Sequence, residues 1–257
     1  MLTVECASLW IGESLGPVER ACLRSVIRQG HRLNLYCYEK PAGVPVGAVL
    51  RDAAEILPRS SIIRHHSGSV ALFSNRFRYE LQRRGLGTWL DCDAYLVRPL
   101  DGASDYLIGE YEPGRVATGI LRMPQDSPLV QPLLGIFDEK TVMPWLPWRA
   151  QLPARWRLIT TGRIGLSKLP WGSAGPVALT HLMHAHGLAD VAVPQQVLYP
   201  VRWQDAEWIL DPGRSLDDVV TPQTVSVHFY NERIKGFKHK PAPPGSVLAR
   251  LHEEGRA

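Results

Sequence analysis

The first forty residues combine two apolar runs of strand length with a helical repeat between them. Residues 2–10 form a mostly apolar run that ends at Gly12. Apolar positions then recur at helical spacing from Val18 to Ile27, and residues 32–38 form the second apolar run. A strand, a helix and a returning strand in so short a span predict a right-handed crossover, which is how a doubly wound sheet begins.

A second helix and strand follow the same pattern. Phe73, Phe77 and Leu81 form one stripe, which predicts a helix over 70–84. Residues 88–97 are apolar and strand-like on both sides of two aspartates. The pattern therefore extends the predicted sheet, and it places two acidic side chains inside an otherwise apolar segment.

The rest of the chain shows shorter signals. Strands are predicted at 105–110, 115–123 and 224–230, and a helix at 176–186. Residues 145–170 are rich in Pro and Trp and poor in periodicity, which predicts a loop-rich insertion. After Pro241 we expect a loosely attached tail with one short helix near 247–253. Together these elements predict an α/β fold with a Rossmann-like mixed central sheet and helices on both of its faces.

Composition and charge narrow the function classes. The 257 residues are 45% hydrophobic and carry a net charge of +4 without a basic block, which favours a folded protein and argues against a nucleic-acid binder. No apolar run reaches the length of a membrane span, and Glu5 with no basic residue before it argues against a signal peptide. The four cysteines lack metal-site spacing, which indicates reduced, buried thiols in a cytoplasmic protein.

The main chemical feature is Asp91-Cys92-Asp93 at the end of an apolar strand. Residues two apart on extended chain point to the same side, so the two carboxylates should lie together while Cys92 packs inward. Burying two carboxylates is costly without a cation or donors, and a hard divalent ion is the economical partner. A solvated turn with two surface acids is the alternative, and spacing alone does not exclude it.

Three other features have both a functional and a structural interpretation. Gly172 to Pro176 lead into a helix start, where free N–H groups could face phosphate or sugar hydroxyls, although an ordinary turn has the same sequence. His228 lies in an apolar strand, where a histidine is more often a core residue than a ligand. Arg78, on a predicted helix, is by default a surface cation.

The motifs are spread over most of the chain. They run from Leu9-Trp10-Ile11-Gly12, through residues 73–79 (FSNRFRY) and 87–93 (GTWLDCD), to Gly172–Pro176, Tyr199-Pro200 and Val227-His228. In this combination the chain resembles the DXD-containing sugar transferases of the α-1,4-galactosyltransferase and α-1,6-mannosyltransferase type, especially their short bacterial members. Asn75, where many relatives have Asp, departs from the pattern and bears on the donor rather than on the reaction class.

The resemblance implies a single GT-A glycosyltransferase domain over 1–240, followed by a C-terminal tail at 241–257. Its nucleotide-binding half would span about 1–123 and its acceptor half about 124–240. Such an enzyme is a hexosyltransferase that moves a sugar from a nucleotide diphosphate donor, most often a UDP-sugar, with retention of configuration and with Mn²⁺ or Mg²⁺. The acceptor would be a glycan or glycolipid in bacterial surface polysaccharide synthesis, such as lipopolysaccharide, with the enzyme cytoplasmic and loosely associated with the inner face of the membrane.

Site residues follow from the same resemblance. Asp93 would bind the metal directly, Asp91 would contribute to the metal or to the donor's ribose, and His228 would be the third protein ligand. Arg78 would hydrogen-bond the donor sugar or its diphosphate. The catalytic set is then Asp91, Asp93 and Arg78, and the donor pocket comprises Trp10, Ile11, Gly12, Asn75, Arg78, Asp91 and Gly175. The tryptophans between 145 and 171 would form an acceptor platform, with a Trp-filled minor core as the alternative.

Two other functions fit parts of the sequence. Haloacid-type phosphohydrolases also carry a DxD, but on the first strand and with a small residue and Thr or Val after it, whereas Ala94-Tyr95-Leu96 follow here. The other is a non-catalytic protein that binds a sugar nucleotide or glycan on the same fold. Neither accounts for the spread of motifs from Leu9 to His228.

The sequence leaves the route of sugar transfer open. For a covalent route Glu110, Glu112, Asp126 and Asp205 are all available, whereas a front-face mechanism needs no nucleophile. The sequence is silent on oligomeric state.

Overall fold

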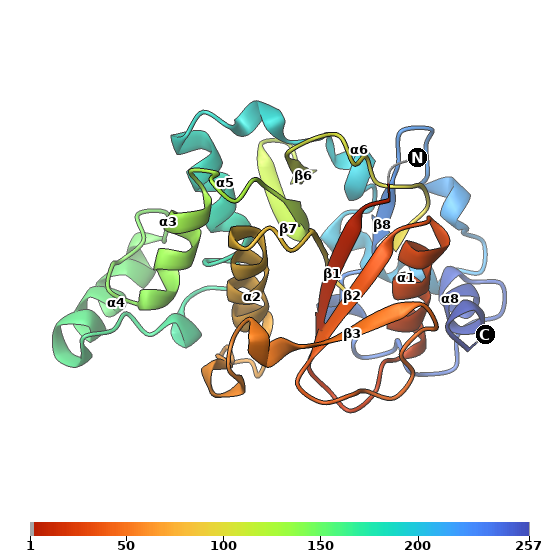
Figure 1. The fold of residues 1–257 in the computed structure, drawn as a ribbon, viewed down its shortest axis with the longest axis horizontal. Helices are drawn as coiled ribbons and strands as arrows, with labels where there is room; N and C mark the ends of the chain where they lie inside the picture. Colours follow the sequence, from red (N-terminus) through yellow and green to blue (C-terminus); the bar gives the residue numbers. More distant parts are fainter. Residues whose placement is uncertain (1–2, 257) are drawn as a thin grey trace.

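The computed structural model describes residues 3–256, and a mixed six-stranded sheet forms its centre (Figure 1). The strands lie in the order β3-β2-β1-β4-β7-β6, of which the first four run parallel and β7 runs antiparallel to both of its neighbours. Their bounds are Glu5–Trp10 (β1), Arg32–Cys37 (β2), Ala48–Asp52 (β3), Thr88–Leu90 (β4), Leu107–Glu112 (β6) and Arg115–Arg122 (β7). The predicted α/β class with a mixed central sheet is confirmed.

Helices cover both faces of this sheet because the strand residues that point to either face are apolar. On one face Cys6 and Leu33 share a buried cluster with Leu23, and on the other Ala7 shares a second cluster with Phe77. This is the expected pattern for parallel strands that are buried on both sides. The helices that provide the two coverings are α1 (Pro17–Arg28), on one side, and α2 (Ala71–Arg83), α3 (Val130–Gly135) and α5 (Pro176–Ala185), on the other.

A two-stranded sheet lies beside the large one. β5 (Ala94–Leu96) pairs antiparallel with β8 (Ser226–His228), so the segment after β4 joins a strand from near the end of the chain. Two one-turn helices flank this part of the fold, α6 (Gln195–Leu198) and α7 (Asn231–Ile234). The strand-like segments predicted at 88–97 and 224–230 are therefore confirmed, although each regular strand is shorter than the apolar run.

The loop-rich insertion predicted for 145–170 is wrong over most of its length. Helix α4 spans Trp148–Thr161 and is followed by irregular chain. Two features of the sequence obscure this helix. Pro153 lies inside it, and apolar residues occur on two opposite sides of it. Ala154 is buried, whereas Trp156, two residues later and so on the opposite side of the helix, is exposed, and no single apolar stripe marks the helix.

The C-terminal helix is confirmed, but its loose attachment is wrong. Helix α8 (Val247–Arg256) packs on α1, and Val247, Leu248 and Leu251 are fully buried. Gly255 lies directly against the first turn of α1, since a Cβ there would be 2.1 Å from the carbonyl oxygen of Pro17. The segment 241–257 therefore contributes to the core through its described residues and does not hang free of it.

Two remaining expectations concern thiols and membrane segments. All four cysteines are free and buried, as predicted. Between residues 3 and 256, no helix is both long and apolar enough to cross a bilayer.

Candidate metal centre

The two aspartates form the turn between β4 and β5. The backbone N–H of Asp91 donates to the carbonyl of Gly119 at 2.7 Å, and that of Ala94 donates back to the Asp91 carbonyl at 3.0 Å, which closes the turn. Cys92 is buried between them, with its thiol 3.5 Å from the carbonyl oxygen of Leu9. The two carboxylates lie together, as predicted, but a turn places them and not the extended chain that the prediction assumed.

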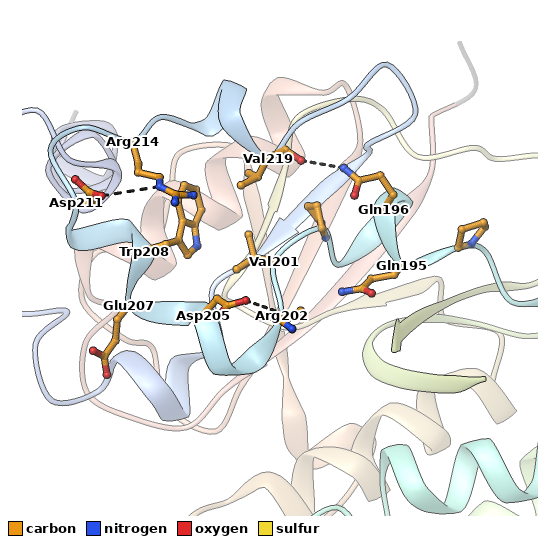
Figure 2. A pocket seen from close by; sticks show the side chains of 12 residues that line it. Gln195, Gln196, Val201, Arg202, Asp205, Glu207, Trp208, Asp211, Arg214 and Val219 are labelled. Atoms are coloured by element: carbon orange, nitrogen blue, oxygen red, sulfur yellow. Dashed lines mark hydrogen bonds and ion pairs between the residues drawn. The ribbon is translucent and has the colours of Figure 1, made fainter. Parts of the chain in front are cut away.

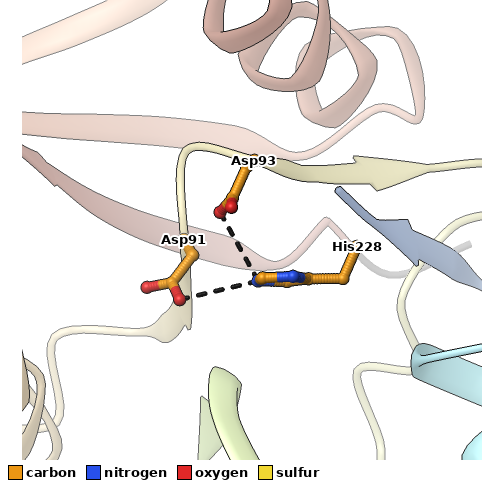
Figure 3. A group of neighbouring side chains, drawn as sticks. All are labelled: Asp91, Asp93 and His228. Carbon is orange, nitrogen blue, oxygen red and sulfur yellow. Dashed lines mark ion pairs between the residues drawn. The ribbon is translucent and has the colours of Figure 1, made fainter. Parts of the chain in front are cut away.

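His228 reaches these carboxylates because β8 pairs with β5. In that register His228 lies opposite Ala94, the residue immediately after the turn. Its Nε2 is 3.6 Å from Asp91 Oδ2 and 3.4 Å from Asp93 Oδ1 (Figure 3). One strand pairing thus brings together side chains that are more than 130 residues apart in the sequence.

The three side chains have the composition and spacing of a divalent-cation site. One ligand atom from each lies within 4.8 Å of the other two. Adjacent ligands of an octahedral ion with bonds of about 2.1 Å are about 3.0 Å apart, and opposite ones about 4.2 Å. Nε2 of His228 is buried and has no hydrogen-bond partner among the described residues, and such an atom is costly to leave unpaired. Two carboxylates and an imidazole therefore fit Mn²⁺ or Mg²⁺ and would leave further coordination positions open.

Arg78 lies against Asp91. Its Nη2 is 3.0 Å from Asp91 Oδ1, while Nη1 donates to the carbonyl of Thr118 and Nε to that of Ser74 at 3.2 Å. The guanidinium also stacks over the ring of Trp89 at 4.8 Å. Arg78 is therefore a buried cation that fixes one carboxylate of the pair, and the expectation of a solvated surface cation is wrong. Its contact with a donor stays a prediction.

Asp93 is held from the other side by the turn that follows β8. The backbone N–H of Asn231 donates to Asp93 Oδ2 at 2.5 Å. Tyr230, just before it, adopts a left-handed backbone with φ 55°, which costs a non-glycine residue free energy and therefore needs support from the surrounding structure. This turn also points the N–H of Tyr230 toward Nδ1 of His228 at 3.3 Å. Two successive backbone donors are thus directed into the cluster.

The contact at Nδ1 bears on the protonation of His228. An N–H that points at Nδ1 favours the tautomer with its proton on Nε2, between the two carboxylates. A metal bonded through Nε2 needs that nitrogen unprotonated. A metal held through Nε2 would therefore need this proton to leave that nitrogen, and a proton moved to Nδ1 would oppose the N–H of Tyr230.

A buried ion pair supports Asn231 from behind. Nζ of Lys238 donates to Asn231 Oδ1 at 2.8 Å and forms a salt bridge with Glu19, a fully buried residue in the first turn of α1. Glu19, Lys238, Asn231 and Asp93 thus form a continuous polar chain that leads from α1 to the site.

The pKa shifts reflect competition between burial and neighbouring charge. Burial alone would raise the pKa of Asp91, but the Arg78 guanidinium, His228 and the Trp89 indole outweigh it, and that pKa lies below its usual value. Burial raises the pKa of Asp93, and the Asp91 carboxylate adds to this. Burial opposes the charging of His228, yet the two carboxylates raise its pKa. The cluster therefore attracts positive charge, which a divalent cation supplies more fully than a proton.

Two hollows adjoin the cluster and share Arg78, Asp91 and His228 among their lining residues. One has a volume of about 350 Å³ and extends past Asp93 to Trp10 and Ile11 at the end of β1. The other, of about 380 Å³, extends past Asn75 and Thr118 to Trp171. Each is the size of a small-molecule site, and the candidate metal site lies where they meet.

Gly12 and Gly175 serve these hollows indirectly. A Cβ at Gly12 would be 3.1 Å from Nε1 of Trp10, and one at Gly175 would be 2.7 Å from Nδ2 of Asn75. Neither glycine is among the residues that line the two hollows. Each therefore makes room for a lining side chain, and contact of the glycines themselves with a donor stays a prediction.

The tryptophans at 145–171 do not form one unit. Trp145 is partly buried, with Nε1 donating to the carbonyl of Ser173 at 2.8 Å, and Trp171 lines both hollows. Trp148 and Trp156 are exposed on α4. The alternative of a Trp-filled core is therefore wrong for Trp148 and Trp156. Of these four tryptophans, only Trp171 lies beside the candidate site, where an acceptor could contact it.

Several site residues carry no signal in the sequence. Gly119 packs directly under the cluster, since a Cβ there would be 2.7 Å from Nε2 of His228. Trp203 lines both hollows, and Asn231 and Lys238 hold Asp93. None belongs to a recognisable motif, because each reaches the site through a contact between segments distant in sequence. Tyr199, within Tyr199-Pro200, is the exception: its ring lies 5.6 Å from that of His228.

A larger hollow lies away from the cluster (Figure 2). It has a volume of about 890 Å³ and includes none of the three candidate ligands. Two of its arginines are already paired with aspartates in the same turn, Arg202 with Asp205 at 2.7 Å and Arg214 with Asp211 at 3.9 Å. Size alone therefore does not select a site here, and the unpaired imidazole nitrogen beside two carboxylates makes the Asp91, Asp93 and His228 cluster the candidate.

No protein-family model matches the chain, and no curated protein matches its sequence. The geometry of the Asp91, Asp93 and His228 cluster therefore carries the functional conclusion.

Proposed function

We propose that this protein is a metal-dependent, retaining glycosyltransferase with a GT-A fold. It would transfer a sugar from a nucleotide diphosphate donor, preferably a UDP-sugar, to a glycan or glycolipid acceptor. The observation that carries the proposal is the convergence of Asp91, Asp93 and the unpartnered Nε2 of His228 at the junction of two hollows. A mononuclear cation site with free coordination positions suits a diphosphate, whose oxygens can occupy those positions.

Each residue has a separate role in this proposal. Asp91, Asp93 and His228 hold the cation, and Arg78 keeps Asp91 ionised and oriented. A bound Mn²⁺ or Mg²⁺ would neutralise the charge that grows on the leaving diphosphate. The indole of Trp10 at the end of β1 provides a flat surface for the base, since ligands of such sheets bind at the carboxyl ends of the strands.

The carboxylates around the hollows favour a front-face reaction. Retention by a covalent route requires a carboxylate on the far side of the anomeric carbon. Glu110, Glu112, Asp126 and Asp205 are all absent from the linings of the two hollows. The lining acids are Asp91 and Asp93 of the cluster and Glu232, which pairs with Lys235. We therefore propose that the leaving phosphate accepts the acceptor's proton.

Thermal unfolding with UDP, with Mn²⁺ and with both tests the donor site. At about 100 times Kd, a ligand that binds only the folded state adds about 2.7 kcal/mol. For a chain of this size that raises the melting temperature by about 5–10 °C. We expect the full shift only with UDP and Mn²⁺ together, and release of UDP from a UDP-sugar as turnover.

Two aspartate variants make this experiment specific. Asp93→Asn keeps an acceptor for the N–H of Asn231 but removes the charge, so it should lose the joint shift. Asp126→Asn changes an exposed aspartate outside the site and should keep it. If no nucleoside diphosphate stabilises the wild-type protein in the presence of Mn²⁺, the proposal fails. A joint shift without turnover of any sugar nucleotide would indicate a binding protein.

A further inference from the structure

Helix α4 exposes an unusual row of large apolar side chains. Trp148, Leu152, Trp156 and Ile159 are 66%, 58%, 68% and 79% exposed. Their spacing of four, four and three residues places them on one face of the helix. The part of the chain that the structure describes contains five large apolar residues that are at least 58% exposed, and four of them lie in this single row. So concentrated a patch indicates an interaction surface.

The row is not a core face left uncovered, because the helix packs through its other side. Ala154 is fully buried, and Leu158 packs against the main hydrophobic cluster. Hydrogen bonds at both ends of the helix fix it in place: Gln151 Nε2 donates to the carbonyl of Leu146 at 2.7 Å, and Arg157 Nε to that of Ile164 at 2.7 Å. The exposed row is therefore presented on a supported helix, at the end of the molecule opposite α8 (Figure 1).

Basic side chains surround the row. At about 100° per residue, Arg149 and Arg155 each lie within about 20° of one edge of the apolar stripe. The segment 140–168 has six lysines and arginines and no aspartate or glutamate, whereas the whole chain carries a net charge of only +4. The positive charge is thus concentrated around the exposed apolar row, and the rest of the chain has a small net negative charge.

The charge decides between the two simplest partners for this face. In a symmetric dimer the same patch would meet itself, and Arg149 and Arg155 of both copies would be brought together. A surface of anionic lipid headgroups instead pairs with the arginines while the apolar side chains enter the boundary of the acyl region. Tryptophan is also the residue that membrane interfaces favour, because its ring is apolar and its N–H is polar.

We propose that α4 docks this protein on an anionic lipid surface. Trp148, Leu152, Trp156 and Ile159 enter the interface, and Arg149 and Arg155 contact the headgroups. The helix lies in the plane of the surface and does not span it. This proposal is independent of the glycosyl transfer proposed above, because none of these six residues lines the two hollows beside the metal site.

Co-sedimentation with lipid vesicles tests it. We expect the full-length protein to sediment with vesicles of phosphatidylcholine mixed with phosphatidylglycerol and to stay in solution with phosphatidylcholine alone. The variant W148S/W156S should lose binding to the mixed vesicles. R149Q/R155Q should weaken it by about 30-fold, since each basic residue near an anionic surface contributes about fivefold. Added salt should weaken binding of the wild-type protein.

Val46→Ser is the matched control, because Val46 is 93% exposed and lies outside the row. It should bind as wild type does, and the thermal midpoints of all variants should stay unchanged, since the altered side chains are exposed. The proposal is overturned if the wild-type protein does not bind the mixed vesicles, or if W148S/W156S binds them as well as wild type does. It is also overturned if gel filtration shows a dimer that W148S/W156S abolishes, because the partner is then a second copy.

Discussion

The buried salt bridge between Lys238 and Glu19 allows the stability of the fold to be separated from the geometry of the metal site. Replacing Lys238 with Met removes the cation and leaves Glu19 with an uncompensated charge in a fully buried position. The same change removes the hydrogen bond from Lys238 Nζ to Asn231 Oδ1, and Asn231 is the residue whose N–H holds Asp93. Lys238→Met should therefore affect both the free energy of unfolding and cation binding.

The expected loss of stability is large. Breaking one partner of a buried ion pair typically costs about 3–5 kcal/mol. With about 2–4 °C per kcal/mol for a chain of this size, the melting temperature should fall by about 6–20 °C. Lys235→Met is the matched control, because Lys235 is 62% exposed and pairs with Glu232 on the surface. Such a pair contributes at most about 1 kcal/mol, so its loss should lower the melting temperature by only a few degrees.

A double variant separates the two effects. In Glu19→Met/Lys238→Met both charges are gone, and most of the lost stability should return, because apolar residues often replace a buried pair without cost. Mn²⁺ binding, measured by isothermal titration, should stay weak in both variants, since neither restores the donor to Asn231. If Lys238→Met has the same melting temperature as the wild-type protein, the pair is not buried as described. If the double variant binds Mn²⁺ as wild type does, the polar chain does not position Asp93.

Two further predictions concern other parts of the molecule. Gly119→Ala should weaken Mn²⁺ binding by about tenfold or more, because its Cβ would be 2.7 Å from Nε2 of His228 and 3.1 Å from Oδ2 of Asp91; an unchanged affinity in isothermal titration would contradict the proposed ligands. Burial alone would raise the pKa of Glu254, but hydrogen bonds from α8 and from Tyr95 outweigh it and lower that pKa. The ionised carboxylate therefore stabilises the fold above the ordinary glutamate pKa, and this contribution disappears as the pH falls through the lowered value. Glu254→Gln should lower the melting temperature at neutral pH, by the equivalent of at most about 1 kcal/mol. In acid the variant and the wild-type protein should have the same melting temperature. A difference that persists in acid would refute the electrostatic cause.

Local pattern was enough to predict the arrangement of the two aspartates, and it was not enough to complete the site. The pattern predicts that the carboxylates of Asp91 and Asp93 lie together, and they do, but residues 91–94 form a turn, so the extended geometry assumed in the prediction is not what places them. His228 joins them only through the pairing of β5 with β8, and residue spacing contains no information about that pairing. The same holds for Arg78. The helical repeat predicts which face of the helix Arg78 lies on, but its contact with Asp91 depends on how α2 packs beside β4.

Helix α4 was missed for a different physical reason. Periodicity detects a helix when one side is apolar and the other polar. In α4 Ala154 faces the core and Trp156 faces outward, so the two apolar sides cancel in the pattern. At the C-terminus the helix itself was visible from the spacing of its apolar residues. Its attachment was not, because it depends on the close approach of Gly255 to Pro17 near the other end of the chain.

The packing of α8 on α1 has a consequence for how the protein is made. Helix α1 is synthesised more than 200 residues before α8, and part of its outer surface is covered only after residues 247–256 have been made. Until then Leu248 and Leu251 are missing from the cluster that encloses Val18 and Cys22. The apolar surface of α1 therefore stays partly uncovered while the residues between the two helices are made, and completing its cluster requires a contact between segments far apart in the sequence.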